Sequence, residues 1–467
     1  MRTAKQERAS TDRAQRPLEG RFTAKRGLVF AGLVGLALTD CAPPSAAASA
    51  PVVRTPAGQK AFPGAMGYGA VSAGGRGGRI IYVTTLADGG PGSLRSCIDY
   101  KFPRVCVFRV NGVIRFTQRP PRIRYPYITI AGQTAPGGGI TLSHNGGANG
   151  QTPLVIKNSH DVVVRHIRVR NDKAGKYRGA EDNITIENSS KVIIDHVSTS
   201  WSRDEGINGY ADNDLVTISN SIFAWGIPKH DKCALLASDP KDKQNLSFIN
   251  NICAHNGDRN PDINFPRGSC VEVVNNILYN AQSEFAEVWE TYGGSPVSIV
   301  SNTFLAGNNT NTNSRGIARE TIGSTGRAQI YLWGNKYEGN FKHISPEVDV
   351  ARVPDGPCPL TVTPQTANAS FYTVLARSGA FPRDDIDDEI LSDVRNRTGQ
   401  IGSPAPALPY QPAANPYPDA DKDGMDDSWE ASHGANPAKS DAWADANGNG
   451  VSNFEDFLTS RERGFGL

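Results

Sequence analysis

The feature that most constrains the fold is a loose internal repeat between residues 162 and 337. Short runs of alternating β-branched residues each end in a polar residue that an apolar residue follows. These polar residues stand at positions 166, 196, 221, 251, 276, 302 and 335. The steps between them are 30, 25, 30, 25, 26 and 33 residues. Such steps are too short for strand–helix–strand units and too irregular for propeller blades, but they suit the coils of a solenoid.

The repeat predicts an all-β fold, a right-handed parallel β-helix. Apolar residues that alternate along each run can pack against the coils above and below, about 4.8 Å away. Asparagine recurs at one corner, where side-chain amides can hydrogen-bond along the stack. A β-sandwich of hairpins would instead require frequent Asn-Gly or Asp-Gly turns, and these are scarce.

Composition agrees with this choice. The 467 residues include 48 glycines, a share that favours turn-rich β structure, and 38% hydrophobic residues suffice for a core. The formal net charge of +2 neither selects nor excludes an anionic partner. No apolar run is long enough to cross a membrane.

Residues 1–48 have the pattern of a signal peptide. Eight basic side chains precede an apolar stretch from Gly27 to Leu38, and an alanine-rich segment at residues 46–49 suits signal peptidase. We therefore expect a secreted protein, extracellular or periplasmic. A lipid anchor at Cys41 is a less favoured alternative, because Asp40 before it fits a lipoprotein signal poorly.

The cysteine count fits an oxidising compartment. Removal of residues 1–48 would leave six of the seven cysteines, at positions 97, 106, 233, 253, 270 and 358. Cys97 and Cys106 are nine residues apart and could close a small disulfide loop, while the pairing of the others stays open. None has the paired spacing of a zinc site.

The composition changes twice beyond residue 400. Residues 401–418 include six prolines and several alanines, which is typical of a semi-rigid linker. An acidic segment follows. We expect residues 58–400 to form the β-helix and residues 419–467 to form a small calcium-binding module.

The acidic segment contains two EF-hand-type loops, each with oxygen ligands at loop positions 1, 3, 5, 9 and 12 and a glycine at position 6. The ligands of the first loop are Asp419, Asp421, Asp423, Asp427 and Glu430. Those of the second are Asp445, Asn447, Asn449, Asn453 and Asp456. Because the first loop has more carboxylates, we expect it to bind Ca²⁺ more tightly. The segment resembles thrombospondin type 3 and dockerin calcium repeats, and we expect it to have a structural role.

Six further motifs occur in a fixed order along the chain. They are AFPGAMGYG (61–69), GGRGG (74–78), PGSLR (91–95), PRVCVF (103–108), VIIDHVSTSW (192–201) and AHNGDRNP (254–261). Together they resemble the pectate lyases of polysaccharide lyase family 1. The resemblance implies β-elimination on polygalacturonate, in which a base removes the C5 proton and the C4–O bond breaks to leave a 4,5-unsaturated sugar.

The resemblance also implies roles for single residues. It makes Arg259 the base at C5 and assigns Lys232 to the substrate carboxylate. Arg267 is a second candidate for this contact, because a guanidinium suits a carboxylate in bidentate geometry. The resemblance makes Asp182 the best candidate for a Ca²⁺ ligand of the active site, and Asp204 and Glu205, expected on the next coil, could approach the same ion. An arginine is normally protonated, so Arg259 can act as a base only if surrounding positive charge favours its neutral form. This predicts an alkaline optimum.

Three positions depart from the family pattern, and several other polar or aromatic residues could have a structural role instead of a functional one. Ala180 and Asn208 stand where relatives often have carboxylates, and Asp262 stands where they often have an arginine. Glu181 would point to the other face of a regular strand. Asp195 and His196 are expected to form a structural corner. Four aromatic residues could stack on sugars or pack in the core, namely Trp201, Trp225, Trp289 and Tyr292.

Other functions fit part of the sequence. A β-helix hydrolase would need closely grouped aspartates and a Gly-His-Gly segment, which are missing. A lyase that acts on methylated pectin or another uronan, and a non-catalytic pectin-binding β-helix, stay open. We expect a monomer with an acidic polysaccharide as partner, and neither nucleic acid nor a membrane span.

Overall fold

The computed structural model describes residues 48–144, 152–171, 181–402, 408 and 410–467. Residues 1–47 of the expected signal peptide, which include Cys41, lie outside the described residues, as do Ala180 and part of the expected linker. No helix among the described residues is long and apolar enough to cross a membrane.

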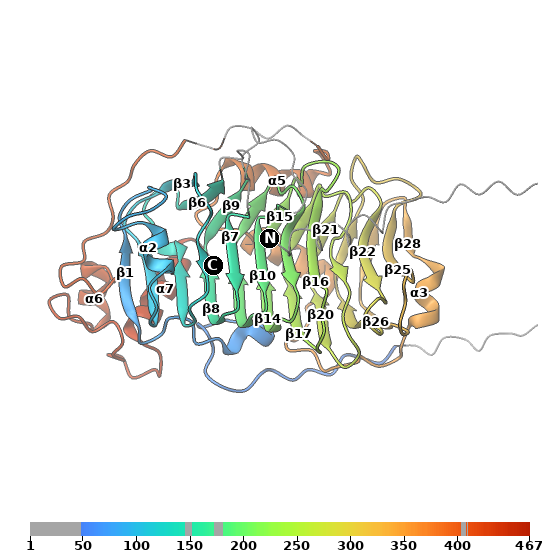
Figure 1. The fold of residues 1–467 in the computed structure, drawn as a ribbon, viewed down its shortest axis with the longest axis horizontal. Coiled ribbons are helices and arrows are strands. Elements are labelled where there is room, and N and C mark those ends of the chain that lie inside the picture. Colours follow the sequence, from blue (N-terminus) through green and yellow to red (C-terminus); the bar gives the residue numbers. More distant parts are fainter. Residues whose placement is uncertain (1–47, 145–151, 172–180, 403–407, 409) are drawn as a thin grey trace, which may run out of the picture. The chain divides into compact units, whose positions relative to one another are not determined.

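Parallel strands stack in three sheets, and from β2 onward each sheet contains every third strand of the chain (Figure 1). Sheet 1 consists of β1 (Arg79–Val83), β2 (Arg104–Phe108), β5 (Ile128–Ala131), β8 (His160–Arg165), β11 (Ser190–Asp195), β14 (Asp214–Ser219), β17 (Asn245–Ile249), β20 (Cys270–Val274), β23 (Pro296–Val300) and β26 (Gln329–Trp333). Sheet 2 consists of β3 (Gly112–Phe116), β6 (Ile140–His144), β9 (Ile167–Arg170), β12 (Ser198–Ser200), β15 (Ile222–Ala224), β18 (Ile252–Ala254), β21 (Ile277–Tyr279), β24 (Thr303–Leu305) and β27 (Lys336–Glu338). Sheet 3 consists of β4 (Arg122–Ile123), β7 (Leu154–Lys157), β10 (Ile184–Glu187), β13 (Glu205–Tyr210), β16 (Lys232–Ser238), β19 (Asp262–Ile263), β22 (Glu284–Trp289), β25 (Arg315–Glu320) and β28 (Lys342–Ile344).

This strand order means that each coil from β2 onward contributes one strand to every sheet, in the order sheet 1, sheet 2, sheet 3, whereas β1 adds a strand to sheet 1 alone. Neighbouring coils pair in parallel, as β11 does with both β8 and β14. The predicted parallel β-helix is confirmed.

The corner between sheets 1 and 2 carries the predicted asparagine ladder. The Asn276 side-chain oxygen accepts from the Asn251 N–H at 2.8 Å, and Asn302 accepts from the Asn276 N–H at 2.8 Å. Asn335 extends the ladder by accepting from the Asn302 N–H at 2.9 Å. Each bond satisfies a backbone donor that the turn leaves without a strand partner.

Strand register corrects the sequence repeat by one residue in the first two coils. Asp195 pairs with Ser219, so His196 is level with Asn220 and not with Ser221. His196 and Asn220 also share the left-handed backbone conformation, with φ of 52° and 47°. The step from residue 196 to its true equivalent, residue 220, is therefore 24. Two adjacent polar positions form this corner, and the sequence did not show which one repeats.

Asn276 provides a direct test of the ladder. Replacing it by alanine removes the acceptor of the buried Asn251 N–H and the donor that reaches the Phe248 carbonyl oxygen at 2.9 Å. We expect a loss of about 2 kcal/mol in the free energy of unfolding. Chemical denaturation measures it, with the exposed Asn313→Ala as the matched control. Equal stability of the two variants would contradict a stabilising ladder.

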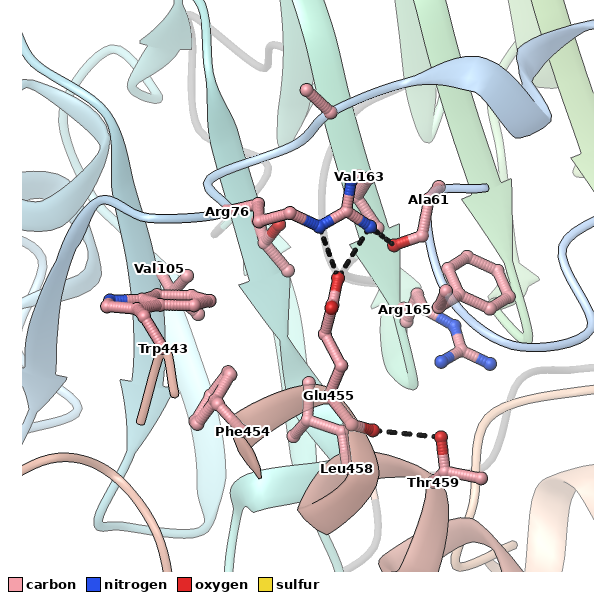
Figure 2. Close-up of a pocket in the computed structure, with 13 residues that line it drawn as sticks. Ala61, Arg76, Val105, Val163, Arg165, Trp443, Phe454, Glu455, Leu458 and Thr459 are labelled. Atoms are coloured by element: carbon pink, nitrogen blue, oxygen red, sulfur yellow. Dashed lines mark hydrogen bonds and ion pairs between the residues drawn. The ribbon is translucent and has the colours of Figure 1, made fainter. Parts of the chain in front are cut away.

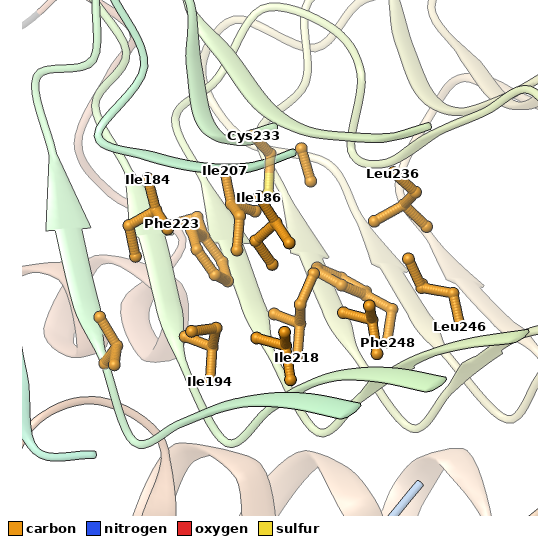
Figure 3. Close-up of a cluster of buried hydrophobic side chains, with 14 of the residues drawn as sticks. Ile184, Ile186, Ile194, Ile207, Ile218, Phe223, Cys233, Leu236, Leu246 and Phe248 are labelled. Atoms are coloured by element: carbon orange, nitrogen blue, oxygen red, sulfur yellow. The ribbon is translucent and has the colours of Figure 1, made fainter. Parts of the chain in front are cut away.

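The interior between the three sheets is filled by stacked apolar side chains. Figure 3 shows Ile184 and Ile207 of sheet 3 over Ile194 and Ile218 of sheet 1, with Phe223 of sheet 2 beside them. Each of these side chains is almost fully buried. The β-branched runs of the sequence supply this core.

Three disulfides connect the six cysteines that follow the expected signal peptide. Cys97 pairs with Cys106, as the nine-residue spacing predicted. The pairs that the sequence left open are Cys233–Cys253 and Cys270–Cys358.

Helices cover the outside of the β-helix. They are η2 (Tyr68–Val71), α2 (Leu94–Ile98), η3 (Gly132–Thr134), α3 (Pro346–Ala351), α4 (Ala367–Arg377), α5 (Asp385–Asn396), α6 (Asp427–His433) and α7 (Asn453–Gly464). Apolar side chains of α4 and α5 pack on the outer face of sheet 2. Figure 1 shows α3 beside β28 at one end of the stack and α6 beyond β1 at the other.

The glycine-rich motifs near the N-terminus allow close packing across sheet 1. A Cβ atom on Gly69 would lie 2.3 Å from the carbonyl oxygen of Val192, and one on Gly75 would lie 1.9 Å from that of Arg104. The Gly69 N–H also donates to Thr217 Oγ1 at 2.8 Å. Any side chain at these two glycines would therefore push the segment off the sheet.

Candidate active site

Three acidic side chains converge where the chain enters sheet 3. Asp182 precedes β10, Asp204 precedes β13, and Glu205 is the first residue of β13. One carboxylate oxygen from each lies within 4.8 Å of the other two. The pairing of β10 with β13 makes Asp182 level with Glu205 on the next coil, because Ile184 pairs with Ile207. The structure thus brings together all three metal ligands expected for the active site.

Neighbouring polar groups orient this carboxylate cluster. Thr185 Oγ1 donates to Asp182 Oδ2 at 2.6 Å. His230 Nδ1 lies 3.2 Å from Asp204 Oδ1. Sequence reasoning missed His230, although it lies only two residues before Lys232. His230 restricts the orientation of Asp204 from the next coil.

The cluster cannot hold three full negative charges at neutral pH without compensation. Burial and the charge of Asp204 raise the pKa of Asp182 to about 7. The same causes hold the pKa of Glu205 well above its usual value. Burial also disfavours the charge of Asp204, yet hydrogen bonds with His230 and Glu205 lower its pKa. Crowded, buried carboxylates of this kind are stabilised by protons or by a cation.

Arg259 closes the cluster on its other side. Its Nη1 donates to Glu205 Oε1, and its Nε lies 3.5 Å from Asp262 Oδ2. Burial acts against the charged guanidinium, but Glu205, Asp262 and Glu287 together raise the pKa of Arg259. The positive charge that a neutral Arg259 requires is therefore not supplied by the side chains that shift its pKa most. Carboxylates surround it, because the coils stack acidic positions on both sides of this arginine.

A second pair of acids continues the row beyond Arg259. Asp262 of β19 pairs in register with Glu287 of β22, and both side chains are buried. Burial raises the pKa of Asp262 to about 6, and burial with the charge of Asp262 raises that of Glu287 to about 8. The departure from the family at position 262 thus adds negative charge next to Arg259.

The two expected carboxylate-binding cations lie in different places. Lys232 begins β16 and pairs in register with Glu205, and its Nζ lies 3.4 Å from Asp258 Oδ1. Arg267 is exposed in the turn between β19 and β20, at the opposite end of β19 from Arg259. Lys232 therefore belongs to the row of charges around Arg259, whereas the structure does not bring Arg267 into it.

Two other polar predictions are explained by packing contacts. Glu181 is buried and pairs with the buried Arg203, apart from the carboxylate cluster, as strand alternation suggested. Asp195 and His196 lie at the end of β11 in sheet 1, where Asp195 accepts from Arg165 and Ser219. Their expected structural role fits this place.

The aromatic candidates divide into two groups. Trp201 and Trp225 are buried and stacked on each other, with ring centroids 6.4 Å apart, so they belong to the packing under α5. Trp289 and Tyr292 are half-buried and bond to acids, Trp289 Nε1 to Glu287 at 2.8 Å and the Tyr292 hydroxyl to Asp239. The second group alone lies beside the charged row of sheet 3.

The first C-terminal loop brings most of its expected ligands together. Carboxylate oxygens of Asp419, Asp421 and Asp423 lie within 4.8 Å of one another, and Asp423 forms a second such group with Glu430. Asp427 is not in either group. Its Oδ1 accepts from the Ala420 N–H at 2.8 Å.

The second loop is folded around Asp456. The side-chain amides of Asn447 and Asn449 donate to Asp456 Oδ2 at 2.8 and 2.9 Å. Asp445 accepts from the N–H groups of Asn449 and Gly450. The remaining expected ligand, Asn453, donates to Asp441 at 3.1 Å and so ties the second loop to the first.

Comparison with known proteins decides the family. A family model described as pectate lyase matches residues 133–319. A probable pectate lyase C from Neosartorya fischeri is 31% identical over 404 residues, which covers 82% of this chain and 89% of that protein. The chain belongs to the pectate lyase family. It is therefore a polysaccharide lyase by family, and the resemblance inferred from the sequence is confirmed.

Further matches agree with this assignment. A probable pectate lyase C from Emericella nidulans is 40% identical over 232 residues, covering 49% of this chain and 50% of that protein. Among solved structures, the major allergen from cedar pollen is similar at 20% identity with a TM-score of 0.52, covering 68% of this chain and 92% of that chain. The last likeness concerns the β-helix fold alone.

Proposed function

We propose that this pectate lyase family member cleaves polygalacturonate by calcium-assisted β-elimination and releases 4,5-unsaturated oligogalacturonides. The observation that carries the proposal is the contact between Arg259 and the buried cluster of Asp182, Asp204 and Glu205. A guanidine placed beside an oxygen-rich site suits a reaction at a carbon next to a carboxylate.

The proposed reaction breaks two bonds of one galacturonate. The neutral Arg259 side chain accepts the C5 proton, and the electron pair of that C–H bond stays on C5 and delocalises into the adjacent carboxylate. This pair then forms the C4–C5 double bond as the C4–O bond breaks, and the leaving oxygen takes up a proton from water. Negative charge grows on the substrate carboxylate during proton removal, so nearby positive charge lowers the barrier. Lys232, level with Glu205, supplies one such charge.

The residues of the cluster fit a calcium ion. Ca²⁺ prefers carboxylate and other oxygen ligands, and here three carboxylate oxygens converge while burial disfavours their ionisation. When bound, calcium would neutralise the cluster and polarise the substrate carboxylate. Neutralisation of Glu205 would also weaken the ion pair that keeps Arg259 protonated.

The test is the absorbance of the conjugated product. Polygalacturonate is incubated with the full chain at several pH values, with added CaCl₂ or with a chelator. We expect an ultraviolet signal that grows with alkalinity and disappears on chelation. An unchanged signal under chelation would contradict calcium assistance and favour a lyase acting on methylated pectin. No signal on any uronan would favour a non-catalytic binder.

The raised pKa of Asp182 leads to a pH prediction for calcium binding. Protons and Ca²⁺ compete for a carboxylate whose pKa is about 7, so affinity rises as pH increases through this value. We expect the Ca²⁺ affinity of the active site to be about tenfold higher at pH 8.5 than at pH 6. Calorimetric titration measures it, and Asp182→Asn should lose most of the difference. Equal affinity at both pH values would argue against binding at this cluster.

We also propose that the protein is exported and acts as a monomer on an acidic polysaccharide outside the cytoplasm. The support comes from the basic and apolar pattern of residues 1–48 and from three disulfides, which persist in oxidising compartments. Fractionation of cells that express the full chain tests this. Recovery of the protein from the cytoplasm would contradict it.

A further inference from the structure

The C-terminal segment holds a group of acids larger than its loop motif. Asp423 belongs to two sets of converging carboxylates, one with Asp419 and Asp421 and one with Glu430 and Asp441. Within each set, one oxygen per residue lies within 4.8 Å of the others. Asp441 lies eleven residues beyond Glu430 and outside the twelve-residue loop.

Two of these side chains point to a missing partner. Glu430 has no exposed surface, and both of its carboxylate oxygens lack a hydrogen-bond donor among the described residues. Oδ2 of Asp421 is likewise buried without a donor in the described part of the chain. A buried carboxylate without donors destabilises the folded chain unless a proton or a cation compensates it. Two groups of converging carboxylates that share Asp423 favour a cation with hard, oxygen-preferring coordination.

The loop that holds these acids is inserted into the outer face of sheet 1. Met425 is fully buried in one apolar cluster with Val105 and Val107 of β2 and with Phe454 of α7. A Cβ atom on Gly424 would lie 3.1 Å from the side chain of Ile80 in β1. The tip of the acidic loop is therefore part of a core that it shares with the first coils.

Polar contacts also join the acidic group to these coils. The Tyr82 hydroxyl of β1 donates to Asp419 Oδ2 at 2.6 Å, and Arg109 Nη1 lies 3.6 Å from the same oxygen. Trp443, two residues after Asp441, donates from Nε1 to the Gly78 carbonyl oxygen at 3.0 Å. A cavity of ≈ 750 Å³ beside β1 is lined by Asp423 and Asp441 together with Lys422 and Lys439.

Helix α7 completes the attachment. Figure 2 shows Glu455 of α7 paired with Arg76, beside Phe454 and Trp443. The cavity between α7 and sheet 1 measures ≈ 30 Å³, about the space of one water molecule. Glu462 at the end of the same helix pairs with the buried Arg165 of β8.

This attachment covers an exposed end of the solenoid. β1 is the terminal strand of sheet 1, and only β2 pairs with it among the described strands. A terminal strand exposes backbone hydrogen-bonding groups and can unfold or associate unless something covers it. Helix α6 lies beyond β1 at this end, and α7 packs on the outer face of the first coils (Figure 1).

We propose that Asp419, Asp421, Asp423, Glu430 and Asp441 bind one divalent cation of the Ca²⁺ class, and that this ion fixes the C-terminal segment as a cap on the first coils of the β-helix. Asp441 takes the place that the loop spacing gave to Asp427. The ion therefore stabilises β1 and β2 as well as the segment that binds it. This site is independent of the proposed lyase reaction.

The test is hydrogen exchange of the full chain with CaCl₂ and with a chelator, resolved by peptide. We expect Ca²⁺ to slow exchange at least tenfold both in residues 419–467 and in β1 and β2, and to raise Tm by roughly 5 °C. Asp182→Asn, which weakens the active-site cluster, should retain these effects. Protection confined to residues 419–467, or no Ca²⁺-dependent protection, would overturn the proposal.

Three variants test the ligand assignment. Glu430→Gln and Asp441→Asn should each weaken Ca²⁺ binding at least tenfold and abolish the protection of β1 and β2. Asp427→Asn serves as the matched control and should retain both within about threefold. Loss of binding in Asp427→Asn with normal binding in Asp441→Asn would overturn the assignment. If a variant fails to fold, hydrogen exchange of the wild-type chain with and without Ca²⁺ still shows whether the ion protects β1 and β2.

Discussion

Arg259→Ala should lower kcat on polygalacturonate by about 10³-fold or more, because a general base contributes roughly 10²- to 10⁴-fold and this guanidinium also balances two buried acids. KM should change much less. The measurement is the initial rate of ultraviolet absorbance at saturating Ca²⁺. Arg377→Ala, at the exposed end of α4, is the matched control and should keep its rate.

Removal of Arg259 also leaves Glu205 and Asp262 without their partner, so folding has to be measured alongside the rate. Arg259→Lys retains a positive charge and should fold, but its amine cannot reproduce the contacts of Nη1 and Nε together. We expect it to lose at least about 100-fold in kcat. A folded Arg259→Ala variant within tenfold of the wild-type rate would show that another group removes the proton.

The largest expected effect on stability concerns the acids that hold α5. Asp387 is fully buried and contacts Arg170 Nη2 at 2.9 Å and Arg168 Nε at 3.3 Å. Asp387→Ala would leave two buried guanidinium groups short of a partner. We expect the free energy of unfolding to fall by about 3–5 kcal/mol.

Chemical denaturation of Asp387→Ala against Asp388→Ala measures this effect. Asp388 is exposed on the same helix, so the pair controls for helix propensity. Asp384 contacts the same arginines and can take over part of the interaction. If Asp387→Ala lowered the free energy of unfolding by less than about 1 kcal/mol, Asp384 would be replacing almost all of the interaction of Asp387 with the two arginines.

The solenoid could be predicted because its repeat is local. Each run of β-branched residues and each corner asparagine can be recognised within one coil, and parallel stacking follows from their regular spacing. The corner at His196 shows the limit of this prediction. The next coil has two adjacent polar residues at this corner, Asn220 and Ser221, and only the strand register shows that Asn220 is the equivalent of His196.

The active site could be predicted only in part. Family motifs indicated Asp182, Glu205, Lys232 and Arg259, and in-register stacking brings these residues into one row. The motifs did not reveal the charge around Arg259. That charge depends on which residues of neighbouring coils face one another, as Asp262 faces Glu287.

The C-terminal segment shows the same limit for a short motif. Loop spacing grouped Asp419, Asp421 and Asp423, whose oxygens converge, but it included Asp427, which lies in neither converging group, and omitted Asp441. Asp427 is the first residue of α6 and bonds to the Ala420 N–H, whereas Asp441 reaches the group from another part of the chain. A contact between separate segments leaves no signal in the spacing of one loop.

The mass of the products formed in H₂¹⁸O tests the central claim most directly. Elimination adds no solvent oxygen. Polygalacturonate digested by the full chain with Ca²⁺ should therefore give oligomers whose new non-reducing ends lack one water, and no oligomer should carry ¹⁸O from cleavage. Reducing ends that contain one ¹⁸O, with no loss of water, would show hydrolysis and contradict proton removal beside the carboxylate cluster.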